Sequence, residues 1–123
     1  RNQGAVRATL RRRADGTALA VVGVHLSSGG GGEDEQARLK ECMSPSLDAS
    51  GAAKGPSLCE WIDLSARAAP TVVCADTNSS PDTPRVQHGG SGRVLNTWQA
   101  LLSARAGLSS VWAAAYDREG AQT

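Results

Sequence analysis

Aromatic residues are scarce in this sequence of 123 residues: phenylalanine is absent, and there are only one tyrosine and three tryptophans. The core must therefore be built mainly from valine, leucine and alanine, and such a core is lean. No apolar run is long enough to span a bilayer, so no membrane span is expected. The net charge of +1 gives no support for non-specific binding to nucleic acids or membranes. The length is enough for one domain.

The sequence also lacks the marks of a secreted or zinc-bound domain. No signal peptide is visible, and the chain opens on Arg1 rather than methionine, which indicates a fragment or a processed chain. Its cysteines, Cys42, Cys59 and Cys74, are odd in number, far apart and in no Cys-x-x-Cys arrangement. Neither a structural zinc site nor a disulfide framework is therefore expected. We predict three free thiols in an intracellular protein of unspecified compartment, with Cys74 as a small core residue.

Residues 4–28 have the pattern of a β-hairpin. Val6, Ala8 and Leu10 alternate with polar or small residues, and residues 14–17 supply a turn around Asp-Gly, a pair that favours positive φ. The second arm, residues 18–25, is apolar on both faces and predicts a central strand covered on both sides. The three arginines before the turn could contact phosphate, but a solvated hairpin end is the favoured interpretation.

Residues 29–57 predict a loop, a helix and a second loop. The glycine run at 29–32 is not a phosphate-binding P-loop, because no Gly-Lys-Ser/Thr follows it. The acidic residues at 33–35 suit the positive end of a helix dipole, and an acidic metal-binding cluster is the alternative. Residues 44–57 are small, polar and rich in glycine, proline and serine, which is typical of an inserted surface loop.

The remaining residues predict alternating helices and strands. A helix is expected over residues 56–68, a strand over 71–75, a long loop over 78–92, a helix capped by Asn96 and stopped at Gly107, and a strand within 108–116. The first helix has Leu58, Trp61, Ile62 and Ser65 on one face, and the second has Trp98, Leu101, Leu102 and Arg105 on one face.

Two of the predicted strands end in polar side chains: "VVGVHL" ends at His25, and "TVVCADTNSSP" runs from the strand into Asp76 and Asn78. A local Asx turn, in which Asp76 or Asn78 accepts from backbone N–H groups, would explain the second pattern without any function. Alternatively, residues 76 and 78 point the same way from an extended strand end, where open sheets commonly place ligands. A carboxylate and an amide there could hold a divalent cation or orient a water beside an anionic substrate. His25 would join them if the two strands are neighbours.

These motifs resemble the endonuclease/exonuclease/phosphatase superfamily, which is deoxyribonuclease I-like. "VVGVHLSS", "DEQARLKE" and "TVVCADTNSSP" are similar to its strand ending in Asn-Thr-His-Leu, its arginine-bearing helix and its strand ending in Gly-Asp-Phe-Asn. The segments "RNQGAVRATLRR" and "LSSVWAAAYDREGAQT" look like its nocturnin and deadenylase-like branch. The resemblance implies an α+β fold, a partial four-layer αββα sandwich of two packed sheets with outer helices, in which residues 1–123 form a single partial domain.

The resemblance also implies a reaction and the residues that carry it. The reaction is Mg²⁺-assisted hydrolysis of a phosphoester by in-line attack of water, with Mn²⁺ a possible substitute. Asp76 would orient the attacking water near the metal, and Asn78 would hydrogen-bond the phosphate or the surroundings of the nucleophile. His25 would donate to a phosphate oxygen, and Arg38 would match the helix arginine in a structural role. The substrate would be a phosphate ester, possibly RNA or a nucleotide.

Departures from the family pattern limit this expectation. Gly23 stands where the family has asparagine, and Ala75 and Thr77 stand where it has glycine and phenylalanine. The 123 residues also contain no counterpart of the family's upstream metal-binding glutamate or of its late Asp-His pair. His88 is no substitute, because it lies in a predicted loop with no aspartate before it. The chain alone is therefore expected to have little activity. The alternative is a catalytically incomplete relative that serves as an interaction or structural module.

Overall fold

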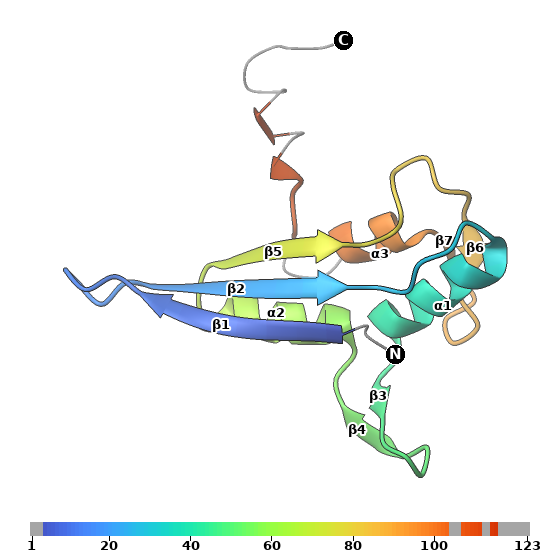
Figure 1. Ribbon diagram of the computed structural model, residues 1–123, viewed down its shortest axis with the longest axis horizontal. Coiled ribbons are helices and arrows are strands. Elements are labelled where there is room, and N and C mark those ends of the chain that lie inside the picture. Colours follow the sequence, from blue (N-terminus) through green and yellow to red (C-terminus); the bar gives the residue numbers. More distant parts are fainter. Residues whose placement is uncertain (1–3, 104–106, 112–113, 116–123) are drawn as a thin grey trace.

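The computed structural model describes residues 4–103, 107–111 and 114–115, which form a mixed α and β fold (Figure 1). Three strands make the main sheet: β1 (Gly4–Arg11), β2 (Ala18–His25) and β5 (Thr71–Asp76). Central β2 pairs antiparallel with β1 and parallel with β5. The crossover from β2 to β5 carries both larger helices, α1 (Gly32–Met43) and α2 (Leu58–Ala68). The predicted hairpin and the predicted strand at 71–75 are thereby confirmed.

The hairpin between β1 and β2 turns where the sequence predicts. Gly16 has φ +72°, and the Asp15 carboxylate accepts a hydrogen bond from the Thr17 N–H at 3.0 Å. Arg12 pairs with Asp15 in an exposed ion pair. Arg12 therefore lies in solvent at the end of the hairpin, which is the interpretation that the sequence favours.

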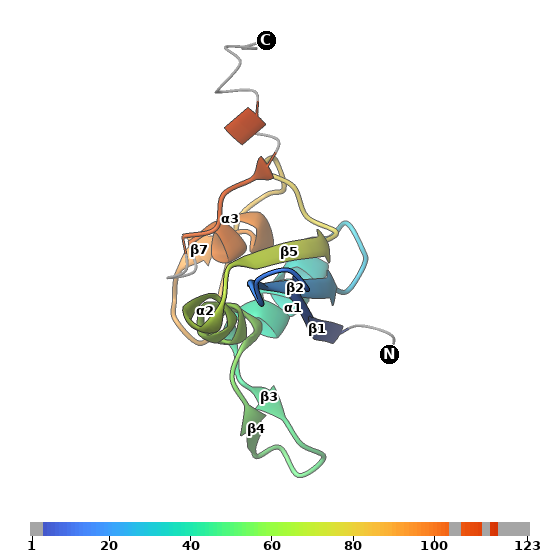
Figure 2. The same cartoon turned by 90° about the vertical axis from the view of Figure 1, so that its left-hand side faces the viewer.

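One face of the sheet is covered and the other is open. Helices α1 and α2 lie on one side of the sheet (Figure 2), where Val22 and Val24 of β2 pack with Cys42 of α1 and Ile62 of α2. The opposite face exposes a set of apolar side chains from all three strands: Val6 at 69%, Leu10 at 55%, Leu19 at 37% and Val72 at 43%. We call this the open face.

The open face corrects two expectations. The apolar character of β2 predicts burial on both sides, but only the side that carries Ala20, Val22 and Val24 is buried. Cys74 is exposed on β5 rather than part of the core, although all three cysteines are free as predicted. Both errors have one cause: a sequence that is apolar on both faces does not reveal whether a second layer is present.

Helix α2 begins at a side-chain cap. Ser57 caps α2: its Oγ accepts from the Glu60 N–H and its own N–H donates to Glu60 Oε2, each at 3.2 Å. This capping box starts the helix two residues after the predicted position at 56. As predicted, the face bearing Leu58, Ile62 and Ser65 is buried.

Helix α3 (Thr97–Leu102) is shorter than the sequence predicts. Asn96 caps it as expected, with its Oδ1 accepting from the Gln99 N–H at 2.9 Å. The helix ends at Leu102, well before Gly107, and it buries Ala100 and Leu101 while Leu102 is exposed. The buried face of α3 is therefore shifted by one residue toward the N-terminus from the predicted face: it carries Thr97, Ala100 and Leu101. Arg105 lies outside the described residues.

Two segments predicted as loops contain short hairpins. The surface segment 44–57 holds β3 (Ser46–Leu47) and β4 (Ala53–Gly55), which project away from the main sheet (Figure 1). The loop 78–92 contains β6 (Val86–Gln87), which pairs with β7 (Val94–Leu95). The strand expected within 108–116 is wrong where the structure describes it: Val111, Ala114 and Ala115 are helical. The other residues expected in that strand's second half, 112–113 and 116, lie outside the described residues.

The coarse fold class, α+β, holds. Within the described ranges there are one three-stranded sheet and two two-stranded sheets. None of the described helices is long and apolar enough to cross a membrane.

Candidate functional site

His25 and Asp76 end adjacent parallel strands and are paired in register. Side chains of residues paired in this way point to the same side of a sheet. Since Val24 points toward the helices, His25 and Asp76 both point toward the open face, and both are exposed. The expectation that their strands are neighbours is confirmed. The carboxyl end of a parallel pair is where open sheets commonly place ligands.

The chain turns sharply just after Asp76. The Asn78 N–H donates to Asp76 Oδ1 at 3.2 Å, and Asn78 has φ +48°, in the left-handed region. This is the Asx turn that the sequence offers as an alternative to a functional site. The premise that residues 76 and 78 project together from an extended strand was therefore wrong. The turn uses Asp76 Oδ1, and no described residue donates a hydrogen bond to the other carboxylate oxygen, which can accept from solvent or a ligand.

The side chain of Asn78 ties the ends of the two strands together. Its Nδ2 donates to the Leu26 carbonyl at 2.9 Å, and the Leu26 N–H in turn donates to the Asp76 carbonyl at 3.0 Å. Within the part of the chain that the structure describes, Asn78 Oδ1 accepts no hydrogen bond. Asn78 thus fixes the edge on which His25 and Asp76 lie, and its amide oxygen stays available as an acceptor.

A buried ion pair between Glu35 and Arg38 of α1 stabilises the loop that follows His25. Glu35 and Arg38 lie one turn apart on α1, each is 1% exposed, and Arg38 Nη2 lies 2.8 Å from Glu35 Oε2. Arg38 Nη1 donates to the carbonyls of Ser27 and Gly29, at 3.0 and 2.8 Å. Arg38 therefore holds the loop that follows β2. Its predicted structural role is confirmed.

The other carboxylate oxygen of Glu35 reaches two further segments. Glu35 Oε1 accepts from the Thr97 N–H at the start of α3 and from Ser79 Oγ, at 3.1 Å, in the loop after β5. Burial alone would raise the pKa of Glu35, but the hydrogen bonds from Thr97 and the ion pair with Arg38 lower that pKa below its usual value. Glu35 stays ionised and connects three segments at this end of the sheet.

The sequence placed Glu35 among the acidic residues at a helix start, and the structure gives it a different role. Its neighbour Asp34 does act at the helix end, where its carboxylate accepts from the Gly31 N–H at 3.0 Å. The signal that could have separated the two is the spacing of Glu35 and Arg38, since residues three apart on a helix share a face.

A cavity of about 880 Å³ opens beside the edge, between the end of β2, α1, the start of α2 and the β3–β4 hairpin. His25 lines it together with polar Lys40 and Glu41 and apolar Leu58 and Trp61. Neither Asp76 nor Asn78 lines it. The three predicted site residues thus lie at the same end of the sheet, but of the three only His25 lines this cavity.

Asp76 belongs to no cluster of metal-binding side chains among the described residues. These residues contain no group of three or more histidine, cysteine, aspartate or glutamate side chains that could hold a metal ion. Asp76 is the predicted metal ligand and offers one carboxylate oxygen beyond the Asx turn. Mg²⁺ in proteins is commonly bound by one or two carboxylates together with water and substrate phosphates. Asp76 therefore suits part of such a site and cannot make one alone.

Comparison of the chain with protein-family models, with curated proteins and with solved structures found no significant match.

Proposed function

We propose that this chain is part of a Mg²⁺-dependent phosphoester hydrolase, a nuclease or phosphatase of the endonuclease/exonuclease/phosphatase type. The observation that carries the proposal is the register of His25 and Asp76, which end adjacent parallel strands and point to one side. A histidine and a carboxylate so arranged are the groups that phosphoester hydrolysis needs side by side: a donor to the phosphate and an acceptor for the attacking water.

Each residue has a role in this proposal. His25 donates to a non-bridging phosphate oxygen and stabilises the charge that develops on it. Asp76 accepts a hydrogen bond from the attacking water with the carboxylate oxygen that the Asx turn does not use. Asn78 keeps His25 and Asp76 in register through its bond to Leu26 and presents its amide oxygen to the same water.

The metal is a further part of the proposal. Mg²⁺, or Mn²⁺ in its place, would neutralise charge on the phosphate when bound near Asp76. One Asp76 oxygen accepts from the Asn78 N–H and the other from the attacking water, so the proposal includes a further carboxylate for the metal, from residues beyond those described. The 123-residue chain alone is therefore expected to be inactive or nearly so.

The open face supports the finer proposal for the fold, a four-layer sandwich. Apolar side chains on one face of a sheet are normally buried against a second layer. Val6, Leu10, Leu19 and Val72 have no such cover among the described residues. In the proposed sandwich a second sheet packs on them, and its loops would approach the edge that carries His25 and Asp76.

A second candidate, an interaction or structural module, is favoured by one observation. The Asx turn and the bond from Asn78 to Leu26 give both Asp76 and Asn78 a structural use. In that case Asp76 and Asn78 serve only to join β2 and β5.

A metal-dependence assay separates the two candidates. The longest natural chain that contains this sequence is assayed against a generic phosphodiester and a generic phosphomonoester, with Mg²⁺, with Mn²⁺ and with a chelator. Turnover that the chelator abolishes and either metal restores supports the hydrolase. Absence of turnover in all conditions, from a folded sample, supports the module and contradicts the hydrolase.

A further inference from the structure

His88 is a buried histidine that the proposed hydrolase does not use. It lies at the β6–β7 hairpin and is 8% exposed. Its Nδ1 accepts from the Ser91 N–H at 3.2 Å and lies 2.9 Å from Ser91 Oγ. Since Ser91 Oγ accepts from the Arg93 N–H at 3.3 Å, the Ser91 hydroxyl proton is available for His88 Nδ1. The neutral imidazole is therefore assigned its proton on Nε2.

The opposite nitrogen of His88 faces Ser44, the residue that follows α1. His88 Nε2 lies 3.4 Å from Ser44 Oγ, and with the proton on Nε2 the histidine is the donor. The Ser44 hydroxyl then keeps its own proton for a third group. The same assignment excludes Ser44 as a nucleophile activated by His88, because a general base at this position needs an unprotonated Nε2.

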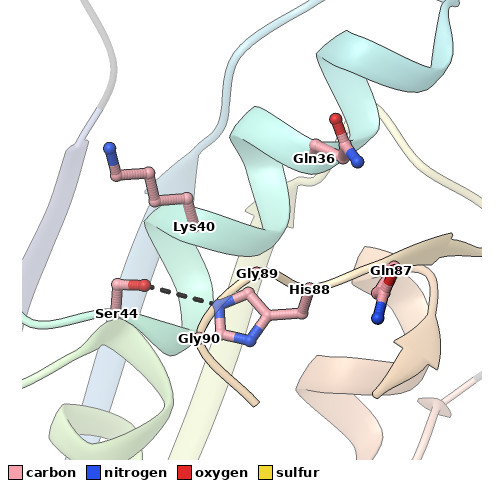
Figure 3. A pocket seen from close by; sticks show the side chains of 7 residues that line it. All are labelled: Gln36, Lys40, Ser44, Gln87, His88, Gly89 and Gly90. Atoms are coloured by element: carbon pink, nitrogen blue, oxygen red, sulfur yellow. Dashed lines mark hydrogen bonds between the residues drawn. The ribbon is translucent and has the colours of Figure 1, made fainter. Parts of the chain in front are cut away.

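These two residues line a groove between α1 and the hairpin, with a volume of about 440 Å³ (Figure 3). Gln36 and Lys40, on one side of α1, and Ser44, which follows the helix, form one wall at intervals of four residues. Gln87, His88, Gly89 and Gly90 form the other. A Cβ at Gly90 would lie 3.0 Å from His88 Cε1, so glycine there makes room for the ring.

Each polar side chain that lines the groove has at least one hydrogen-bond donor. Of the described residues that line the groove, Lys40 alone carries a fixed charge and none carries a carboxylate. The ion pairs among the described residues are Arg12–Asp15 and Glu35–Arg38, so Lys40 has no carboxylate partner there. Lys40, Ser44 and the two glutamines each carry an N–H or O–H group that can donate to an anion, and of these side chains that of Ser44 lies closest to the His88 ring (Figure 3).

We propose that this groove binds an oxyanion, the phosphate or carboxylate group of a small ligand. Lys40 supplies the charge, and the Ser44 hydroxyl, polarised by His88 Nε2–H, supplies a directed hydrogen bond. Charge-assisted hydrogen bonds of this kind are roughly twice as strong as neutral ones. The site uses none of His25, Asp76 and Asn78, so it stands or falls independently of the proposed hydrolase.

The test is a titration of the longest natural chain that contains this sequence, ¹⁵N-labelled and followed by amide chemical shifts. Inorganic phosphate and acetate are added in separate arms at constant ionic strength, with chloride as the control anion. The shifts of Ser44, Gly89 and Gly90 are expected to saturate in at least one arm, in the millimolar range. Saturation by phosphate alone indicates a phosphate group, and saturation by acetate alone indicates a carboxylate. Linear, unsaturated shifts in both arms would overturn the proposal.

Matched variants separate binding from general charge effects. Lys40→Met is expected to weaken the saturating anion about tenfold, the loss of about 1.4 kcal/mol, and Ser44→Ala is expected to weaken it by a smaller factor. Lys54→Met removes a lysine from the exposed strand β4 and should leave binding unchanged. Equal binding by the folded Lys40→Met variant would contradict the proposal. A ¹⁵N spectrum of the His88 ring showing the proton on Nδ1 would contradict the direction of its bond to Ser44.

Discussion

Glu35 and Arg38 form a buried ion pair whose remaining hydrogen bonds reach three separate segments of the chain. The guanidinium holds the loop after β2, and the carboxylate holds the loop after β5 and the start of α3. The edge that carries His25 and Asp76 therefore depends on two residues that never reach the surface. A substitution in this ion pair is therefore expected to lower the stability of the fold rather than to act directly on the reaction.

Glu35→Gln is predicted to destabilise the chain by about 3–5 kcal/mol at neutral pH, because it leaves the Arg38 charge buried without its partner. Urea unfolding followed by circular dichroism measures the difference. Glu33→Gln is the matched control, since Glu33 is exposed in the first turn of the same helix. Equal midpoints for the two variants would show that the ion pair contributes nothing to stability.

The stabilisation by Glu35 is predicted to depend on pH. Because the pKa of Glu35 is lowered in the folded chain, its contribution is fully present above the pKa of the unfolded chain, about 4.3. It is lost as the pH falls through the folded pKa. The stability difference between the wild type and Glu35→Gln should therefore shrink in acid. The pKa of Asp15 is also lowered, by Arg12, but Asp15 is present in both proteins and cancels in the difference.

Asn78 gives a third prediction, for the connection between β5 and β2. Asn78→Gly keeps the positive φ and removes the bond to Leu26, which should cost about 1 kcal/mol. Asn78→Ala should cost about 1–2 kcal/mol more, because alanine is unfavourable in the left-handed region. Thermal unfolding of the two variants measures this order. If alanine were tolerated as well as glycine, residue 78 would not hold the left-handed conformation.

The exposed thiol of Cys74 gives a fourth prediction. Burial raises the pKa of Cys59 to about 11 and raises that of Cys42 further, and the thiolate is the reactive form. One thiol per chain should therefore react fast with a chromogenic disulfide at mildly alkaline pH. The fast reaction should disappear in Cys74→Ser. Its persistence in that variant would show that another thiol is exposed instead.

The elements of the fold were predictable because local signals determine them. The Asp-Gly turn, the cap at Asn96 and the apolar face of α2 depend on neighbours within a few residues. The adjacency of the strands ending at His25 and Asp76 was also predicted, from the repeated pattern of an apolar strand with a polar end. The length of α3 and the helical conformation of Val111, Ala114 and Ala115 were not, because helix and strand are ambiguous in short apolar runs.

The parts that failed depend on contacts distant in sequence. Nothing near Cys74 or Leu19 in the chain indicates that their face of the sheet is open. The role of Glu35 depends on Ser79 and Thr97, more than forty residues away. The Asx turn at Asp76 was foreseen as an alternative, but the choice between it and an extended strand end depends on the acceptor that Leu26 offers to Asn78.

The central claim is that Asp76 acts on phosphoester substrates at the edge it shares with His25. The most direct test is the Mg²⁺-dependent kcat of the longest natural chain, measured for the wild type, Asp76→Asn and the control Asp82→Asn, which changes an exposed aspartate in the loop after β5. We predict that Asp76→Asn lowers kcat about a hundredfold or more, that Asp82→Asn leaves it unchanged, and that both variants stay folded. Full activity in a folded Asp76→Asn variant would contradict the claim.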